Sequence, residues 1–169
     1  IPSAANAYLG ADVERRQRVA TALLPGQTLL TGAFRLDIGA RGEERAFNTL
    51  VAMRRIETAA GPDLQLTALY DKHRLVPLGE FLPLRPILEP IGFVRLVHAP
   101  ADFTHGPVPA PIEAPGLPRV QPLICYESLF PGLASGAGPR PLWIVNASND
   151  SWFGRTSGPW QHLNIASHR

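Results

Sequence analysis

The sequence has little cysteine, no long apolar run and no concentration of charge, and each shortage excludes a class of protein. Its single cysteine, Cys125, excludes an intrachain disulfide and a cysteine-rich metal site. No stretch approaches the roughly 18 consecutive apolar residues of a membrane-spanning helix. The 16 basic and 14 acidic residues are scattered and leave a formal net charge of +2, so no basic patch indicates nucleic-acid binding.

The chain also opens without a recognisable leader. Ile1 is followed by neither a basic segment nor an apolar core of the kind found in a signal peptide. We therefore expect the chain to be part of something longer. Its 169 residues, 45% of them hydrophobic, are enough for one packed domain or a large part of one.

Apolar runs separated by turn residues predict both strands and helices, which places the chain in the α/β class. A first helix is expected after Asp12, its N-cap, and should end at Pro25-Gly26. Its apolar face is expected to hold Val13, Ala20, Leu23 and Leu24. Strands are expected at residues 28–36, 47–56, 64–70, 120–124 and 142–147. The last two are apolar enough for strands covered on both faces. A second helix is expected over residues 160–168.

Residues 76–122 differ in character, because they contain most of the eighteen prolines. Proline blocks long helices and central strands, so we expect irregular chain with a short helix near residues 85–91. Large apolar side chains, such as Phe81, Leu82 and Phe93, lie among these prolines. A long irregular insertion of this kind, at about 76–118, suggests a lid or binding loop. The alternative is a plain surface connection.

Cys125 follows the apolar strand of residues 120–124 and precedes an expected helical turn at Tyr126-Glu127. A strand-to-turn junction can present a nucleophile at a sheet edge, and the next backbone N–H can face a developing oxyanion. A thiol with an ordinary pKa of about 8.5 needs a nearby base or cation to react as a thiolate. Glu127 would orient neighbouring groups. The alternative is that Cys125 only packs as a small apolar residue.

Lys72 lies just after the third predicted strand, and Glu80 follows it by eight residues. A lysine close to the thiol would stabilise the thiolate and later an oxyanion. Glu80 would then either hold Lys72 or act as an acid–base group. The alternative for both residues is a solvated surface loop, where lysine and glutamate are usually found.

The last segment, from residue 146 on, places polar residues after a strand and adds three aromatic side chains. Trp152, Phe153 and Trp160 would either line a pocket or pack. His162 and His168 have no second ligand at a spacing typical of zinc sites. We therefore expect no metal and no cofactor.

Three segments resemble the apolipoprotein N-acyltransferases of the nitrilase-like carbon–nitrogen hydrolase superfamily. They are YDKHRLVPLGEFLPLR (70–85), ICYESLFPG (124–132) and NASNDSWFGRTSGPWQHLNIASHR (146–169), in the family's order. The opening IPSAANAYL is similar to the segment that comes after the family's Trp-Pro-Glu motif. The resemblance implies a nitrilase-like α-β-β-α sandwich. In this view residues 1–169 form a partial catalytic domain that lacks the first strand and helix and the C-terminal strands.

The resemblance also implies roles for single residues. Cys125 matches the nucleophile, Lys72 the lysine of the Glu-Lys-Cys triad, and Glu80 a further glutamate required for activity. Tyr126 and Glu127 match the supporting residues after the cysteine. The general-base glutamate of the family is expected ahead of Ile1, so the isolated chain is expected to be inactive. The substrate lid is expected to include Phe81, Leu82, Phe93 and Trp152.

The implied reaction moves an acyl chain from a phospholipid, through a thioester on Cys125, to the N-terminal amine of a diacylglyceryl-cysteine lipoprotein. The family works at the bacterial inner membrane, anchored by segments outside this chain, with the catalytic domain facing the periplasm. Two alternatives stay open. One is a soluble nitrilase or amidase with the same triad, and the other is a non-catalytic fragment that only packs or binds.

Overall fold

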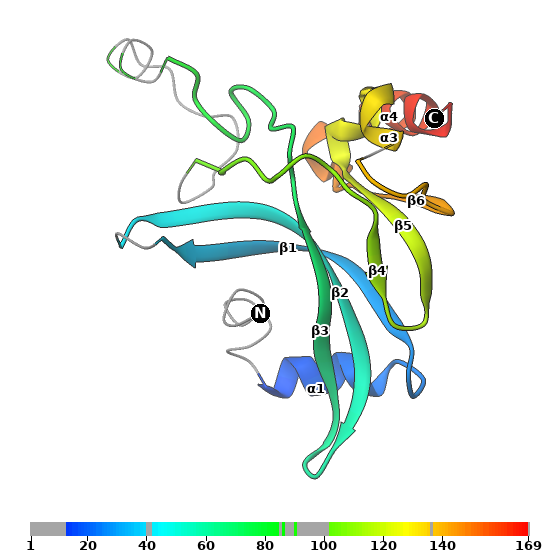
Figure 1. Ribbon diagram of the computed structural model, residues 1–169. Helices are drawn as coiled ribbons and strands as arrows, with labels where there is room; N and C mark the ends of the chain where they lie inside the picture. The colour runs from blue at the N-terminus through cyan, green and yellow to red at the C-terminus, as the bar shows by residue number, and fades with distance from the viewer. Residues whose placement is uncertain are drawn as a thin grey trace.

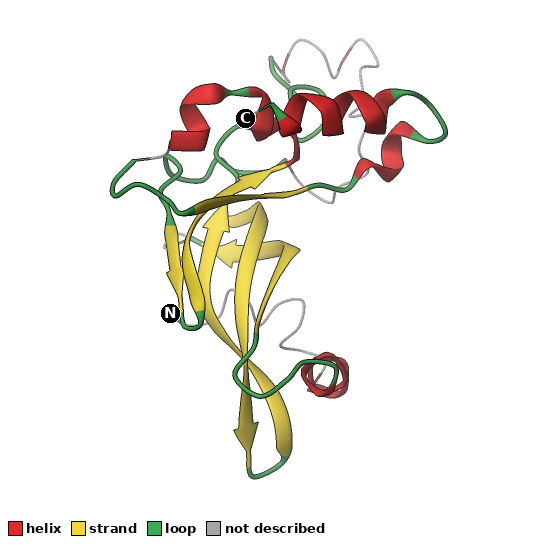
Figure 2. Cartoon of the chain, turned by 90° about the vertical axis from the view of Figure 1, so that its right-hand side faces the viewer, coloured by secondary structure: helices red, strands yellow, loops and turns green. Residues whose placement is uncertain are grey.

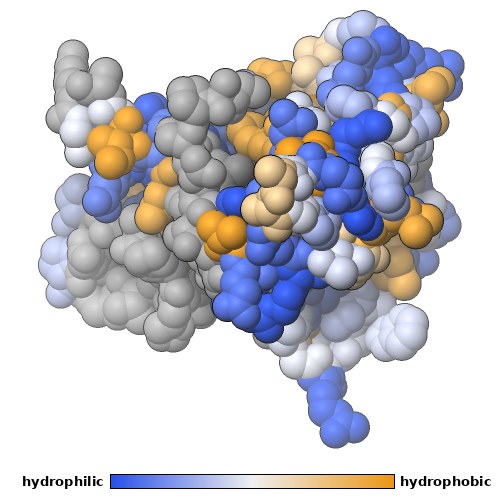
Figure 3. All heavy atoms as spheres, turned by 90° about the horizontal axis from the view of Figure 1, so that it is seen from below, coloured by the Kyte–Doolittle hydropathy of each residue, from blue (hydrophilic) through white to orange (hydrophobic). Residues whose placement is uncertain are grey.

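The computed structural model describes residues 13–39, 42–84, 86, 90, 102–135 and 137–168, and the side chain of Trp152 is not described. This part of the chain forms two three-stranded sheets, with one helix on a sheet face and the other helices beyond the strand ends (Figure 1). On the face seen in Figure 3, apolar residues lie in small groups among hydrophilic ones. No helix among these residues has the length and apolar character needed to cross a bilayer.

The first sheet is an antiparallel meander in the order β1-β2-β3. Its strands are β1 (Thr28–Ile38), β2 (Glu44–Thr58) and β3 (Gly61–Asp71). The turn between β2 and β3 uses Gly61 with a φ of 106°, a left-handed conformation that favours glycine. The meander predicted from the sequence is confirmed, and each strand extends beyond its predicted end.

Helix α1 (Val13–Thr21) covers one face of this sheet. Side chains alternate between the faces of a strand, so Val51 and Met53 of β2 pack toward Ala20 of α1. The predicted helix is confirmed, but it ends at Thr21 rather than at Pro25-Gly26, and Asp12 lies outside the described residues. Its apolar face is narrower than expected, because Val13 is 50% exposed and Leu24 is 67% exposed.

The second sheet has the order β4-β5-β6. Strand β4 (Ile112–Ala114) forms a hairpin with β5 (Leu117–Ile124), and β6 (Trp143–Ala147) pairs with β5 in parallel. Residues 120–124 of β5 are buried, as expected. The expectation that β6 is covered on both faces is wrong, because Trp143 and Ile144 are 37% and 39% exposed. In the described chain β6 is an edge strand.

Helical segments gather beyond the ends of β5 and β6 (Figure 2). They are η3 (Cys125–Leu129), α3 (Pro131–Ser135), η4 (Asp150–Phe153) and α4 (Gly158–Ser167). The turn expected after Cys125 and the final helix are thus confirmed, and α4 begins two residues earlier than predicted. The short helix predicted near residues 85–91 falls largely outside the described residues.

The two sheets pack on one another through Leu50 of β2, Tyr70 of β3 and Ile124 of β5. Cys125 packs against this cluster. The order of layers is therefore α1, the first sheet, then the second sheet, which agrees with the incomplete nitrilase-like sandwich. This packing brings the ends of β3 and β5 together, and the segments after these two strands contain Lys72 and Cys125.

Candidate active site

Lys72 and Glu80 form a buried ion pair just beyond β3. The Nζ atom of Lys72 lies 2.7 Å from Oε2 of Glu80, and the two side chains are 2% and 8% exposed. Asn48 donates from Nδ2 to Oε1 of Glu80, and the N–H of Val76 donates to Oε2, both at 2.8 Å. A lysine buried this deeply needs such a partner. Glu80 could either hold Lys72 or act as an acid–base group, and the ion pair agrees with the first of these roles.

The backbone around Lys72 is anchored on both sides. Its N–H donates to the carbonyl of Asn48, and its own carbonyl accepts from the N–H of Gly106, both at 2.8 Å. The preceding residue, Asp71, is buried and accepts from Arg35 at 2.6 Å and from Thr49 at 2.6 Å. The lysine therefore extends from a rigid strand end.

Glu127 connects this strand end to the turn that contains Cys125. It is fully buried, and one of its oxygens, Oε1, accepts three hydrogen bonds at 2.8 to 2.9 Å while Oε2 accepts one at 2.8 Å. The four donors are the hydroxyl of Tyr70 and the backbone N–H groups of His73, Arg74 and Ile124. Burial and the neighbouring charge of Glu127 raise the pKa of Tyr70, so this phenol stays a donor.

Cys125 is half-buried and has a φ of 51°, which is unusual for a residue with a Cβ. Its carbonyl oxygen accepts from Oγ of Ser128 at 3.1 Å and lies 3.1 Å from Nε2 of His162. The unusual backbone places the thiol at the junction between β5 and η3. This position suits a nucleophile that must be both accessible and rigid.

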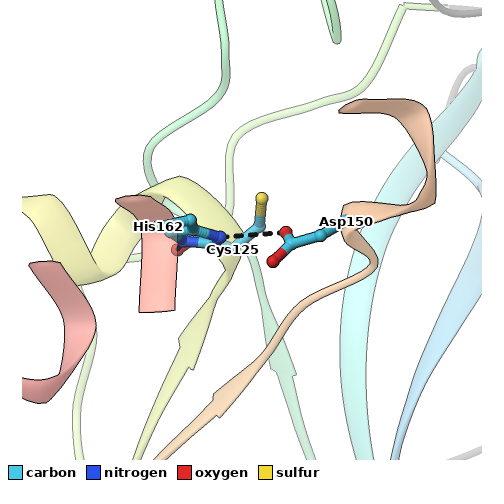
Figure 4. Close-up of side chains that lie close together, drawn as sticks. All are labelled: Cys125, Asp150 and His162. Atoms are coloured by element: carbon cyan, nitrogen blue, oxygen red, sulfur yellow. Dashed lines mark hydrogen bonds and ion pairs between the residues drawn. The ribbon is translucent and has the colours of Figure 1, made fainter. Parts of the chain in front are cut away.

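His162 and Asp150 join Cys125 from two further elements, α4 and η4 (Figure 4). Nδ1 of His162 lies 2.9 Å from Oδ1 of Asp150, and the two side chains are 10% and 26% exposed. Donor atoms of Cys125, Asp150 and His162 lie within 4.8 Å of one another, close enough to hold a metal ion. The spacing of residues along the sequence did not predict this group, because its members lie on three separate structural elements that only the fold brings together.

The other predicted site residues have different surroundings. Tyr126 is 37% exposed and packs edge-on against Phe130 at 5.3 Å between ring centroids. Phe81 is half-buried and Leu82 only 7% exposed, which differs from the exposed apolar patch expected of a lid. Leu84, two residues on, is 69% exposed. Phe93 and the side chain of Trp152 lie outside the described residues.

Sequence reasoning did not single out Asn48, Tyr70, Asp150 or His162 as members of the site. Three of them lie inside the motif segments 70–85 and 146–169, so the motifs could have indicated them. Asn48 lies in β2 outside every motif, and only the fold brings it to Glu80.

Comparisons with known proteins agree with the motifs. Residues 26–169 match the profile of the carbon–nitrogen hydrolase family. An apolipoprotein N-acyltransferase of Caulobacter vibrioides is 51% identical over 169 residues, which is 100% of this chain and 31% of the relative. One of Bradyrhizobium diazoefficiens is 39% identical over 164 residues, 96% of this chain and 29% of the relative. One of Azotobacter vinelandii is 38% identical over 143 residues, 83% of this chain and 25% of the relative.

The resemblance inferred from three short segments is therefore confirmed over the length of the chain. The chain spans about a third of the length of the first of these relatives.

Proposed function

Because the chain belongs to the carbon–nitrogen hydrolase family, we propose that it is the catalytic part of an apolipoprotein N-acyltransferase. The observation that carries this proposal is the hydrogen bonding of Glu127. It ties the segment after β3, which contains Lys72, to the end of β5, which leads into Cys125. The thiol of Cys125 and the buried amino group of Lys72 thus follow two strand ends that the carboxylate of Glu127 holds together.

In the first step, the thiolate of Cys125 attacks the carbonyl carbon of a phospholipid acyl ester. A base takes the thiol proton, a C–S bond forms, the ester C–O bond breaks, and the base passes this proton to the oxygen of the departing lysophospholipid. The ammonium group of Lys72 carries three N–H groups, and Glu80 accepts from one of them. We assign Lys72 the stabilisation of the oxyanion, because a fixed cationic donor is most effective in a site shielded from water.

In the second step, the α-amine of a diacylglyceryl-cysteine attacks the thioester carbonyl. An amide C–N bond forms and the C–S bond breaks, while the base takes a proton from the amine and passes it to the sulfur to restore the thiol. Dividing the transfer in two replaces one difficult displacement by two easier ones. The base is expected to be the glutamate of the family's Glu-Lys-Cys triad.

The proposed donor is a phospholipid and the proposed acceptor carries a diacylglyceryl group, so the site is expected to work at a membrane surface. Membrane attachment would come from segments outside this chain, and the catalytic part would face the periplasm. The exposed apolar residues of the 76–118 insertion, such as Leu84, are the proposed contact with acyl chains.

The proposal is tested by trapping the thioester. The whole protein that carries this chain is incubated with phospholipid, and the peptide containing Cys125 is analysed by mass spectrometry. We expect an added acyl mass that hydroxylamine removes and that is absent in Cys125→Ala. An acyl adduct that persists in Cys125→Ala would exclude Cys125 as the nucleophile.

The second candidate, a soluble amidase or nitrilase, shares the family and the cysteine. Incubating the same protein with small amides and nitriles, and measuring the ammonia released, distinguishes this candidate from the acyltransferase. Release of ammonia without any phospholipid thioester would favour the hydrolase. The formation of neither ammonia nor a thioester would favour a non-catalytic role.

A further inference from the structure

Three side chains of the kinds that bind zinc converge at the junction after β5. The thiol of Cys125, a carboxylate oxygen of Asp150 and a ring nitrogen of His162 lie within 4.8 Å of one another (Figure 4). They come from η3, η4 and α4, so each is held by a different element. Among the described residues no other group of three such side chains comes this close together.

The separations are close to those around a bound zinc ion. Zinc bonds of about 2.0–2.1 Å to nitrogen and oxygen and about 2.3 Å to sulfur place two tetrahedral ligand atoms about 3.3–3.6 Å apart. Nδ1 of His162 and Oδ1 of Asp150, now 2.9 Å apart, need to separate by only a few tenths of an ångström. The sulfur needs to approach them by about 1 Å, which is within reach of a side-chain rotation at the half-buried Cys125.

The surrounding contacts match the outer shell of a metal site. A histidine that binds a metal normally donates its other ring N–H to an oxygen, and a carboxylate ligand normally accepts a further hydrogen bond. Nε2 of His162 lies 3.1 Å from the carbonyl oxygen of Cys125, so a ring that binds metal through Nδ1 can donate there. The hydroxyl of Ser148 donates to Oδ1 of Asp150 at 2.6 Å. Both contacts orient the ligand atoms for a shared cation.

The set of ligands selects the class of cation. Thiolate, imidazole and carboxylate are ligands of zinc and of similar divalent ions such as cobalt. Magnesium and calcium prefer sites built from oxygens, and of the three ligands only Asp150 supplies oxygen. The carboxylate of Glu127, two residues after Cys125, already accepts four hydrogen bonds and is not an additional ligand.

We propose that Cys125, Asp150 and His162 form a binding site for a zinc-like divalent cation, and that the bound cation blocks the thiol. On binding, the thiol releases its proton to solvent and a metal–sulfur bond forms. The sulfur is then no longer free to attack a carbonyl carbon. A water completes the fourth position, as in zinc sites with three protein ligands. The block of acyl transfer rests on the proposed function, whereas metal binding itself does not.

The test titrates cobalt(II) into the whole protein after a chelator has removed any metal. Cobalt held by the thiolate is expected to give a sulfur-to-cobalt charge-transfer band in the near ultraviolet. The affinity for zinc is then measured by its competition with cobalt. Magnesium at the same concentrations should leave the spectrum unchanged, because it does not favour thiolate or imidazole ligands.

Variants of the three ligands show whether they act together. Cys125→Ala should abolish the charge-transfer band. Asp150→Asn and His162→Leu should each weaken cobalt binding at least about tenfold, because loss of even an outer-shell partner costs a metal site about 10–100-fold in affinity. His168→Leu is the matched control, since this histidine is exposed at the end of α4 and its loss should leave the affinity unchanged.

Protection of the thiol locates the cation by a second measurement. Zinc should slow the alkylation of Cys125 by iodoacetamide, read by mass spectrometry of the peptide containing Cys125. The protection should persist in His168→Leu and be largely lost in Asp150→Asn at the same zinc concentration. Zinc should also stop thioester formation with phospholipid. Cobalt binding through Cys125 in a protein that forms no thioester would contradict the proposed function and support the metal site.

A cobalt-loaded protein without the charge-transfer band would overturn the proposal. Equal affinities in Asp150→Asn, His162→Leu and the unmodified protein would overturn it too, because the thiol alone would then hold the ion. If His162→Leu does not fold, Asp150→Asn decides alone. An affinity at least about tenfold lower in that variant supports the site, and a smaller change overturns it.

Discussion

The hydroxyl of Tyr70 donates a 2.8 Å hydrogen bond to Oε1 of Glu127, and this contact joins β3 to the turn after β5. Both groups are buried, and the ring of Tyr70 also packs against Ile124 between the sheets. The same carboxylate accepts from the backbone on either side of the junction. Glu127 thus links two strand ends that belong to different sheets.

Glu127→Gln should reduce stability and acyl transfer together. Glutamine keeps one acceptor oxygen, and its amide nitrogen would face a backbone N–H that loses its partner. A buried donor left unpaired costs about 2–3 kcal/mol, measured as the free energy of unfolding in urea. Tyr70→Phe removes only one of the four donors and should cost about 1 kcal/mol. Equal losses of unfolding free energy in Glu127→Gln and Tyr70→Phe would contradict the role of Glu127 as the link between the two strand ends.

Lys72→Met should abolish most activity and also destabilise the protein. It leaves Glu80 buried without its ion-pair partner, which typically costs about 3–5 kcal/mol. Loss of one oxyanion donor lowers the rate of thioester formation about 10²–10³-fold.

Pairing Lys72→Met with Glu80→Gln separates these two effects. The double variant should recover most of the stability, measured by urea unfolding, and none of the activity. Arg18→Met, which breaks an exposed pair with Glu14, is the control and should cost less than about 1 kcal/mol. Recovery of acyl transfer in the double variant would exclude the role assigned to Lys72.

Gly106→Ala should disturb the end of β3. A Cβ at this position would lie 2.0 Å from the carbonyl oxygen of Asp71, and the N–H of Gly106 also holds the carbonyl of Lys72. Because backbone atoms must move, we expect a loss of about 3 kcal/mol in unfolding free energy and slower thioester formation. Gly132→Ala, which meets nothing within 4 Å, is the matched control. An unchanged unfolding free energy in Gly106→Ala would contradict the close approach of Gly106 to the carbonyl of Asp71.

Leu84→Asp tests the predicted lid. Leu84 is 69% exposed with a φ of 50°, a conformation that aspartate tolerates, so unfolding free energy should change little. Thioester formation with phospholipid vesicles should fall several-fold, because a charge replaces an apolar contact. Leu142→Asp, at a position 77% exposed next to β6, should leave that rate unchanged. Equal rates in both variants would remove Leu84 from the lid.

Much of the fold could be predicted because its signals are local. Alternation of apolar residues and the turn residues between the strands predicted β1 to β3, and an apolar run ending at Cys125 predicted β5. Strand β4 was not anticipated, because its three residues lie in a proline-rich segment where a local signal for a strand is weak. Whether β6 is covered depends on its neighbours and not on its own apolar residues.

The family, the lone thiol and the residues able to assist it could all be inferred from the order of amino acids. It takes the fold to show that Glu80 holds Lys72, that Glu127 joins two strand ends, and that His162 meets Asp150 at the carbonyl of Cys125. Such contacts join segments 8 to 57 residues apart. Their partners are chosen by which strand ends the packed sheets bring together, because a buried carboxylate or imidazole takes the donors and acceptors that lie beside it.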